Sequence, residues 1–250
     1  MISTTGSEPA SVSAPGGRVS KMLIDLFMKR ATVAVLDDVA ELYRLVTLEG
    51  PGLRDIAWVP GAQIQFPMAG SVLAVRTYTP IEWNAQAGRL VILAYLHGCG
   101  PGSAWLSGLV PGEQCDFYGP RKSIDARALP GELAVFGDET SIGLGYALAR
   151  QDPRKVVSLY LEIGDVVSAE RIIADLGIEN VTLFAKLEDE AHLVQMDEVL
   201  APLVNRGTSF VLTGKAGTIQ RQRQALRKLG VSSNRIAAKA FWATGKQGLD

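Results

Sequence analysis

Two short stretches carry side chains that could together hold a phosphate-bearing ligand. The first is RTYT, from Arg76 to Thr79, and the second is HGCGPGS, residues 97–103. Alternate side chains of a strand share a face, so we expect Arg76 and Tyr78 to point one way, and Thr77 and Thr79 the other. Arginine can donate to phosphate oxygens, tyrosine offers a flat face for stacking, and a threonine hydroxyl can bond a heterocycle nitrogen. An ordinary strand with an exposed arginine would also explain the first stretch.

The glycine-rich stretch is typical of a loop that binds an anion. The apolar run RLVILAYL leads into it, and we expect SAWLSGL to begin a helix with Ser103 as its cap. Glycines let backbone N–H groups converge on an anion, and a helix start adds a favourable dipole. An ordinary strand-turn-helix connection remains an alternative, and His97 could be a cofactor ligand or a turn residue. Two such pieces close together in the sequence are stronger evidence for a phosphate-binding site than either piece alone.

Short strands separated by turn signals must position these residues. From Arg30 to about Lys122 the runs are short, rich in β-branched residues and bounded by glycine and proline, which predicts a small antiparallel barrel. KMLIDLFMKR, residues 21–30, could be a first strand or a short helix. From about Arg127, apolar strands alternate with helix-like stretches, which predicts an open parallel sheet with helices on both faces. We therefore expect a flexible tail at residues 1–20 and two domains, over 21–126 and 127–250.

Composition limits the classes of function. The chain has 250 residues, is 47% hydrophobic and carries a formal net charge of -1, so neither nucleic-acid binding nor membrane insertion is expected. Two cysteines and two histidines show no metal-ligand spacing, so we expect no metal site. The Ser, Pro and Gly-rich start has no apolar core typical of a signal peptide, which leaves the cytoplasm as the expected compartment.

The stretch GDETSIG, residues 137–143, lies at the first strand-to-helix turn of the second domain. Open α/β sheets bind ligands at such turns, although this stretch lacks the G-x-G-x-x-G fingerprint. We expect Thr140 and Ser141 to cap the helix, and Thr140 could also face a cofactor. His192 lies in an acidic helix start and is expected at the solvent-facing surface.

Five motifs occur in an order and spacing that resemble one known family. RTYT, HGCGPGSAW, PGEQCDFYGPRKS, GDETSIG and KAFWATGK resemble the siderophore-interacting proteins, from about residue 20 to the end. These are flavin-dependent ferric-siderophore reductases with a ferredoxin-reductase-like fold. The resemblance implies an FAD-binding β-barrel over residues 21–126 and an NAD(P)-binding-like α/β domain over residues 127–250.

The resemblance also implies residue roles. Arg76 would hold the FAD pyrophosphate, while Tyr78 and Thr79 would contact the isoalloxazine as the catalytic pair. Thr140 would approach the flavin from the second domain. The remaining cofactor-binding residues would be Thr77, His97, Gly98, Pro101, Gly102 and Ser103.

Electron donor and substrate follow from the same resemblance. NADPH, NADH or a ferredoxin would supply electrons, and the substrate would be a ferric siderophore or another ferric chelate. Lys239, Trp242 and Lys246 would form a lip for this anionic substrate, although each lysine could equally be solvated surface.

Departures from the family pattern leave alternatives open. Gly102 stands in place of alanine, Lys122 in place of glycine, and Lys215 in place of an acidic residue. The last change, together with the tail FWATGK, leaves open a flavin-binding electron carrier or a reductase of a different acceptor. LVILAYLHGCG also resembles the oxyanion loop of α/β-hydrolases, but ETSIG lacks the first glycine of the nucleophile elbow.

Overall fold

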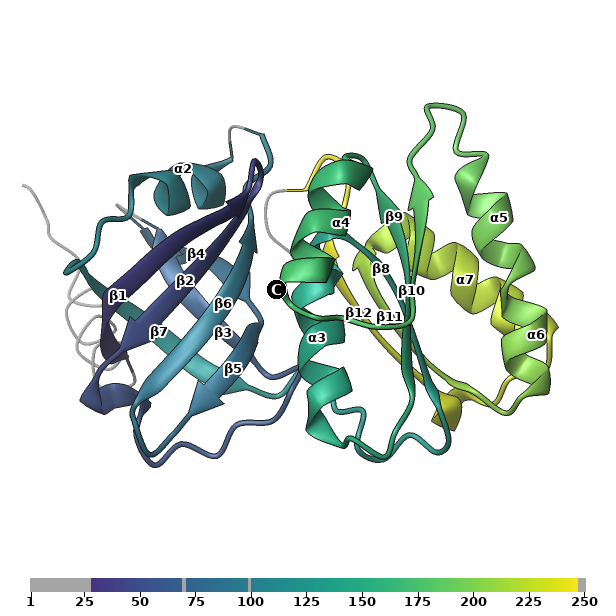
Figure 1. Ribbon diagram of the computed structural model, residues 1–250, viewed down its shortest axis with the longest axis horizontal. Coiled ribbons are helices and arrows are strands. Elements are labelled where there is room, and N and C mark those ends of the chain that lie inside the picture. Colours follow the sequence, from purple (N-terminus) through teal and green to yellow (C-terminus); the bar gives the residue numbers. More distant parts are fainter. Residues whose placement is uncertain (1–27, 69–70, 99, 247–250) are drawn as a thin grey trace, which may run out of the picture.

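A seven-stranded antiparallel sheet forms the first half of the molecule (Figure 1). The computed structural model describes residues 28–68, 71–98 and 100–246, with side chains left out at residues 71–74. The strand order is β4-β3-β7-β1-β2-β6-β5, and Thr79 alone joins the two edge strands, so the end of β4 lies next to the start of β5. The strands are β1 Lys29–Ala40, β2 Tyr43–Glu49, β3 Gln63–Met68, β4 Ser71–Tyr78, β5 Pro80–Asn84, β6 Arg89–Tyr95 and β7 Gln114–Arg121.

Alternating apolar side chains fill the interior of this sheet. Ile64 and Phe66 of β3 and Phe117 of β7 are almost fully buried in one cluster, which Leu106 of helix α2 (Pro101–Gly108) also joins. The short 3-10 helix η1 (Pro51–Leu53) follows β2. Two strands, β5 and β7, were not predicted from the sequence. β5 begins at a proline and β7 contains Gly119 and Pro120, and both residue types are normally signals for the end of a strand.

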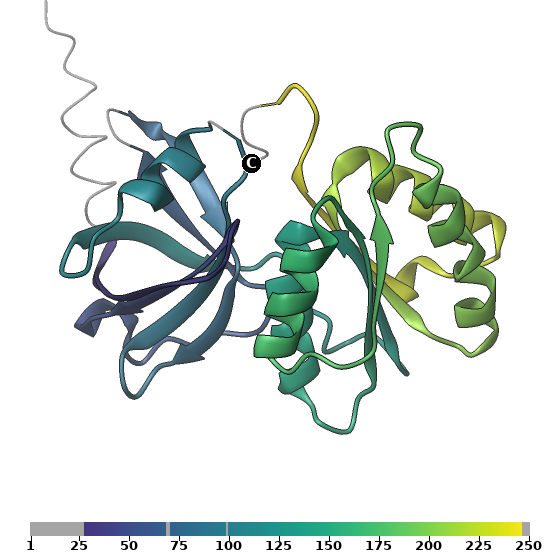
Figure 2. The ribbon, with the colours of Figure 1, turned by 45° about the horizontal axis from the view of Figure 1, so that its top comes forward.

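A five-stranded parallel sheet forms the second half, in the order β10-β9-β8-β11-β12. Helices cover both of its faces, with α3 and α4 on the side of the antiparallel sheet (Figures 1 and 2). The predicted fold class is confirmed. The elements are β8 Leu133–Asp138, η2 Glu139–Ser141, α3 Ile142–Gln151, β9 Val157–Ile163, α4 Val166–Asp175, β10 Val181–Ala185, α5 His192–Glu198, α6 Leu200–Asn205, β11 Ser209–Lys215, α7 Ala216–Lys228, η3 Ser233–Arg235 and β12 Ile236–Trp242.

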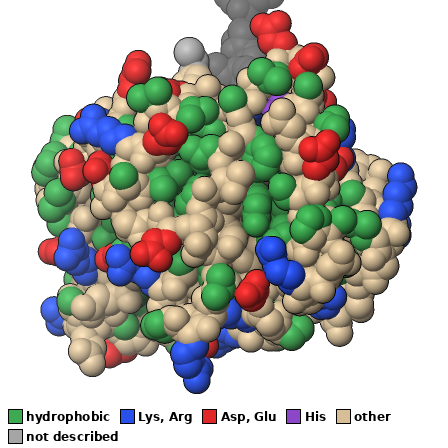
Figure 3. All heavy atoms as spheres, turned by 45° about the vertical axis from the view of Figure 1, so that its right-hand side comes forward, with side chains coloured by type: hydrophobic (Ala, Val, Ile, Leu, Met, Phe, Trp, Pro, Cys, Tyr) green, Lys and Arg blue, Asp and Glu red, His purple; other side chains and the backbone are tan. Residues whose placement is uncertain are grey.

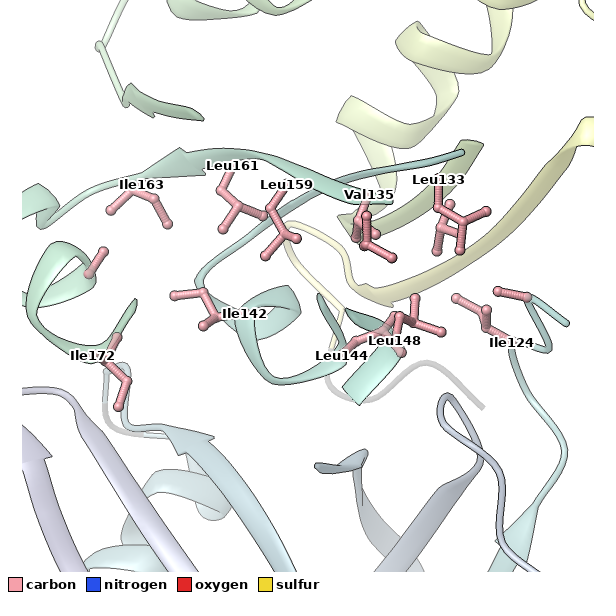
Figure 4. Close-up of a cluster of buried hydrophobic side chains, with 14 of the residues drawn as sticks. Ile124, Leu133, Val135, Ile142, Leu144, Leu148, Leu159, Leu161, Ile163 and Ile172 are labelled. Atoms are coloured by element: carbon pink, nitrogen blue, oxygen red, sulfur yellow. The ribbon is translucent and has the colours of Figure 1, made fainter. Parts of the chain in front are cut away.

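The two halves share one buried apolar cluster. Figure 4 shows side chains of β8 and β9, such as Val135 and Leu159, pointing toward those of α3, such as Ile142 and Leu144. Tyr43 of β2 belongs to the same cluster. The packing depends on close approach, because a Cβ on Gly145 of α3 would lie 2.3 Å from a methyl carbon of Leu159. Residues of the first half such as Tyr43 therefore pack into the core of the second half.

The helix starts differ in part from those that the sequence predicts, where Ser103, Ser168, and Thr140 with Ser141 are the expected caps. The cap of α4 is Asp165, whose carboxylate accepts a hydrogen bond from the Ser168 backbone N–H, so Ser168 lies inside the first turn. Helix α2 begins at Pro101 after Gly100, which places Ser103 one turn too late to be the cap. Ser141 is the N-cap residue of α3, as expected, although its side chain makes no cap bond there; the preceding η2 has Asp138 as its cap. Asp and Gly cap helices as well as Ser, so residue type alone did not distinguish them.

Two further predictions fall wholly or partly outside the described residues. The tail at residues 1–20 lies outside them, as does most of KMLIDLFMKR, whose last two residues begin β1. No helix within the described ranges combines the length and apolar character needed to cross a membrane. Charged side chains of both signs are interspersed with apolar ones on the face shown in Figure 3.

Candidate functional site

Arg76 and Tyr78 share the face of β4 that looks toward the start of α2. A Cβ placed on Gly102 would lie 3.1 Å from the Tyr78 hydroxyl oxygen and 3.4 Å from Cγ of Arg76. The Tyr78 ring packs against Phe66 and Trp105, with both pairs of ring centroids 5.9 Å apart. Burial raises the pKa of Tyr78 above its usual range, so the residue stays neutral. The face predicted from strand alternation is confirmed.

The guanidinium of Arg76 is largely uncommitted. Its Nη1 donates to the Val75 carbonyl oxygen at 2.8 Å, and no carboxylate of the described residues forms an ion pair with it. A guanidinium carries five N–H donors, so most of those on Arg76 remain open to a ligand. This is the geometry that a diphosphate needs from an arginine that lies beside a helix start.

Thr77 and Thr79 are placed differently from each other. The Thr77 hydroxyl accepts a hydrogen bond from Gln65 Nε2 at 3.2 Å, and Arg121 in turn donates to Gln65 Oε1 at 2.7 Å. Thr77 therefore faces away from Arg76, so the structure does not bring these two predicted ligands together. Thr79 is half-buried at the junction of the two edge strands, next to Tyr78.

The loop at residues 97–103 is folded onto itself but open on one side. His97 stacks on Tyr95 with ring centroids 5.5 Å apart, and the Ser103 hydroxyl donates to the His97 carbonyl oxygen at 2.8 Å. Gly98 has φ +64°, a conformation that favours glycine, and a Cβ there or at Gly100 would meet no atom within 4 Å. Pro101 occupies the first helical position. The loop therefore has free space where backbone N–H groups could meet a diphosphate.

A buried carboxylate lies at the turn after β8, in the second half. Asp138 is fully buried and accepts hydrogen bonds from the Thr140 backbone N–H at 2.9 Å, from the Thr140 hydroxyl, and from Trp242 Nε1 at 2.6 Å. Burial raises the pKa of Asp138. Gly214 allows this arrangement, because its φ is +89° and a Cβ there would lie 2.4 Å from the carboxylate. The Thr140 hydroxyl is thus already committed.

Glu139 is buried beside Asp138 and also fully paired. Lys186 Nζ lies 2.6 Å from its Oε2, and the Gly164 backbone N–H donates to its Oε1 at 2.7 Å. Sequence reasoning did not single out Lys186. The signal that could have found it is its position directly after β10, at the same edge of the sheet as Glu139.

The prediction that His192 lies on the surface is wrong. His192 is only 3% exposed, and its Nε2 lies 3.1 Å from Glu162 Oε2. Thr218 donates to the other Glu162 oxygen at 2.7 Å, and the Leu187 backbone N–H donates to His192 Nδ1 at 3.1 Å. Glu162 interrupts the apolar run of β9, and a buried acid of this kind requires a partner, which is the sequence signal for this cluster.

The proposed substrate residues are not gathered into one group. Trp242 is anchored to Asp138, whereas Lys239 is half-buried on β12 and Lys246 is exposed. No side-chain hydrogen bond or ion pair of either lysine is found in the described part of the chain. Lys215, one of the departures from the family pattern, forms an ion pair with Glu190 at 3.0 Å.

The two serines relevant to a hydrolase are occupied by other bonds. Ser103 donates to a backbone carbonyl, and Ser141 is fully buried, with Thr213 donating to its hydroxyl at 2.8 Å. Neither bonds to a histidine side chain within the described ranges, so neither has the base that would activate it. These ranges also contain no group of three or more His, Cys, Asp or Glu side chains able to hold a metal ion.

Part of the chain that contains the candidate site is similar to a known family of domains. Residues 53–124, which contain both RTYT and the glycine-rich loop, match the siderophore-interacting FAD-binding domain. No curated protein sequence matches the chain. The resemblance noted from the sequence is confirmed.

Solved structures extend the likeness from the FAD-binding domain to most of the chain. The siderophore-interacting protein SipS from Aeromonas hydrophila has a TM-score of 0.71 and 25% identity, over 88% of this chain and 92% of SipS. The siderophore-interacting protein from Acinetobacter baumannii has a TM-score of 0.68 and 15% identity, over 87% of this chain and 91% of its own. A ferredoxin reductase of carbazole 1,9a-dioxygenase has a TM-score of 0.69 and 17% identity, over 85% of this chain and 68% of its own. The last two structures share so little sequence with this chain that they establish only its fold.

Proposed function

We propose that the chain is an FAD-dependent oxidoreductase that reduces the iron of a ferric siderophore or a similar ferric chelate. The observation that carries the proposal is the pairing of an uncommitted Arg76 with an open glycine-rich loop inside the FAD-binding domain. NADPH, NADH or a ferredoxin would supply the electrons. Bound FAD can accept two electrons from such a donor and pass them on one at a time.

The residues of the first half would bind and orient the cofactor. Arg76 would donate to the diphosphate, together with backbone N–H groups of the loop at residues 97–103 and the start of α2. Tyr78 would flank the ring system, because its own ring is held by Phe66 and Trp105 and cannot turn freely. Thr79 would offer its hydroxyl at the edge of the ring, from the single-residue junction of β4 and β5.

The second half would close the site from the other side. Trp242 is fixed through its bond to Asp138, so the last residues of β12 stay at the carboxyl edge of the parallel sheet. A ligand that approaches this edge from solvent would meet Trp242 before it met the buried acids. Electron donors and ferric chelates would therefore reach the flavin only past this residue. Reduction to Fe(II) would loosen the chelate, since the less charged ion suits hard oxygen ligands less well.

A second candidate is a flavin reductase whose acceptor is not a siderophore. The ion pair between Lys215 and Glu190 favours it, because this lysine cannot attract an anionic chelate at full strength. Both candidates share the flavin site and differ only in the electron acceptor.

Stopped-flow reduction tests the proposal. The FAD-loaded chain is mixed anaerobically with NADPH, NADH or reduced ferredoxin, and the reduced protein is then mixed with ferric chelates of different net charge. Rapid reoxidation by at least one ferric siderophore, with Fe(II) captured by a colorimetric chelator, is expected. Rapid reoxidation by other acceptors but by no ferric chelate favours the second candidate, and failure to bind FAD contradicts both.

A further inference from the structure

A second cavity lies at the seam of the two halves, far from the proposed flavin site. Its volume is about 790 Å³, within the range of roughly 300–1,000 Å³ typical of small-molecule sites. It is bounded by Leu133, the first residue of β8, and by the loop Asp152–Lys155 before β9. These lie at the amino end of the parallel strands, whereas Asp138 and Thr140 lie at the carboxyl end. The cavity therefore belongs to neither the cofactor nor the donor.

The walls of this seam cavity are apolar and aromatic. Trp58 and Trp83 line it from the first half, with ring centroids 6.5 Å apart and an interplanar angle of 25°. Trp83 is fixed by its bond to the Leu53 carbonyl oxygen at 3.0 Å, whereas the buried Trp58 Nε1–H has no hydrogen-bond partner among the described residues. Ile81 and Leu133 close the interior and are nearly fully buried. Such walls suit a planar aromatic ring.

The charges around the seam cavity favour an anion. Four cationic side chains line it against two carboxylates. Arg154 is paired with Asp152 at 2.9 Å, and Lys155 donates to the Leu129 carbonyl oxygen. Arg127 is paired with Asp125, which lies outside the lining. Each of these three cations therefore already has an ion-pair or hydrogen-bond partner.

Arg150, at the end of α3, is the exception. Its guanidinium lies 4.6 Å from the centre of the Tyr146 ring, and no carboxylate of the described residues forms an ion pair with it. The Tyr146 hydroxyl donates to Glu82, the second carboxylate of the lining, which is thus bonded to a neutral group and forms no ion pair with the described residues. Arg150 can therefore attract one anionic group, and Glu82 opposes it.

We propose that the seam cavity binds a planar aromatic molecule that carries one carboxylate. The ring would lie against Trp58 and Trp83, and the carboxylate would pair with Arg150. Because the walls come from both halves, the ligand would bridge the antiparallel and the parallel sheet.

Calorimetric titration of the full chain with 2-naphthoate tests this proposal, with neutral 2-naphthamide as the matched ligand. We expect 2-naphthoate to bind at least about tenfold more tightly than the amide, since a charge-assisted bond contributes more than one tenfold step in Kd. Arg150→Met should weaken 2-naphthoate binding by about tenfold, and Glu82→Gln should strengthen it. Arg154→Met is the control, because Arg154 lines the same cavity but is already paired, and it should change Kd by less than about twofold.

Three results would overturn the proposal: no saturable binding of 2-naphthoate, equal affinity for the acid and the amide, or equal losses for Arg150→Met and Arg154→Met. Displacement of bound FAD by 2-naphthoate would also overturn it, because the ligand would then occupy the flavin site. The titration needs no electron transfer, so its failure leaves the proposed function standing, and the reverse also holds.

Discussion

The two halves of the molecule differ in how their polar groups are satisfied. In the first half, the Arg76 side chain bonds only a neighbouring carbonyl among the residues that the structure describes, and Gly98 and Gly100 face open space. Helix α2 has no side-chain cap for its first N–H groups. In the α/β half, the buried acids of the strand ends, Asp138 and Glu162, each accept hydrogen bonds from at least two partners.

This difference separates two kinds of function. A site with unused donors is completed by a ligand, so residues there should matter for affinity and little for folding. A buried network whose acids already accept hydrogen bonds from neighbouring side chains is part of the core, so its residues should matter for stability.

The largest expected effect is on the stability of the α/β half. Glu162→Ala leaves His192 and Thr218 buried without their partner, which should lower the free energy of unfolding by about 4 kcal/mol. Urea denaturation measures it, and Glu198→Ala, an exposed acid on α5, is the control. The folded variant should keep its FAD affinity. A loss of FAD affinity without a loss of stability would mean that Glu162 serves the cofactor site and not the core.

Arg76→Ala is the counterpart in the FAD-binding half. Loss of a charge-assisted contact should raise the Kd for FAD by about a hundredfold, or about 3 kcal/mol, as followed by quenching of flavin fluorescence. The stability of the flavin-free chain should change by less than about 0.5 kcal/mol. Arg89→Ala is the control, since Arg89 lies on strand β6 of the same sheet in an exposed ion pair with Glu49. Unchanged FAD affinity would remove the role given to Arg76.

Trp242→Phe tests whether the end of β12 is held by its hydrogen bond to the buried Asp138. The change deletes the donor to Asp138 and should cost about 1.5 kcal/mol of unfolding free energy. Trp83→Phe deletes a bond to the neutral Leu53 carbonyl instead and should cost less, about 1 kcal/mol. Thermal or chemical denaturation compares the two. Equal stability of Trp242→Phe and the parent chain would mean that the indole is not held there.

The smallest expected effect is a pH dependence set by Asp138. Burial raises its pKa above the ordinary 3.8, so the native state keeps a proton that the unfolded chain has lost. The stabilising contribution is complete below pH 3.8 and is lost as the pH rises through the raised pKa. In that window stability should fall by up to about 1.4 kcal/mol per pH unit relative to Asp138→Asn. Parallel pH profiles of the two proteins would contradict the assignment.

Local patterns predicted the parts of the site that depend on neighbours in sequence. Strand alternation placed Arg76 and Tyr78 on one face and Thr77 on the other, as the contacts of Gly102 and Gln65 show. The alternation from strands to helices predicted the parallel sheet, because its central strands β8, β9 and β11 are largely buried on both faces and read as apolar runs.

Contacts between distant segments could not be predicted in this way. Trp242 and Asp138 are 104 positions apart, and His192 and Glu162 are 30 apart. Each pair forms only because parallel strands bring their carboxyl ends to one edge of the sheet. The acidic residues around His192 indicate a surface helix, and only the tertiary packing of α5 against β9 buries it.

Titration of the flavin-free chain with FAD tests the central claim most directly. The account predicts saturable binding of one FAD per chain, with loss of affinity in Arg76→Ala and none in folded Glu162→Ala. A chain that binds no FAD, or that binds it equally well without Arg76, would contradict the claim that this half of the molecule is completed by a dinucleotide.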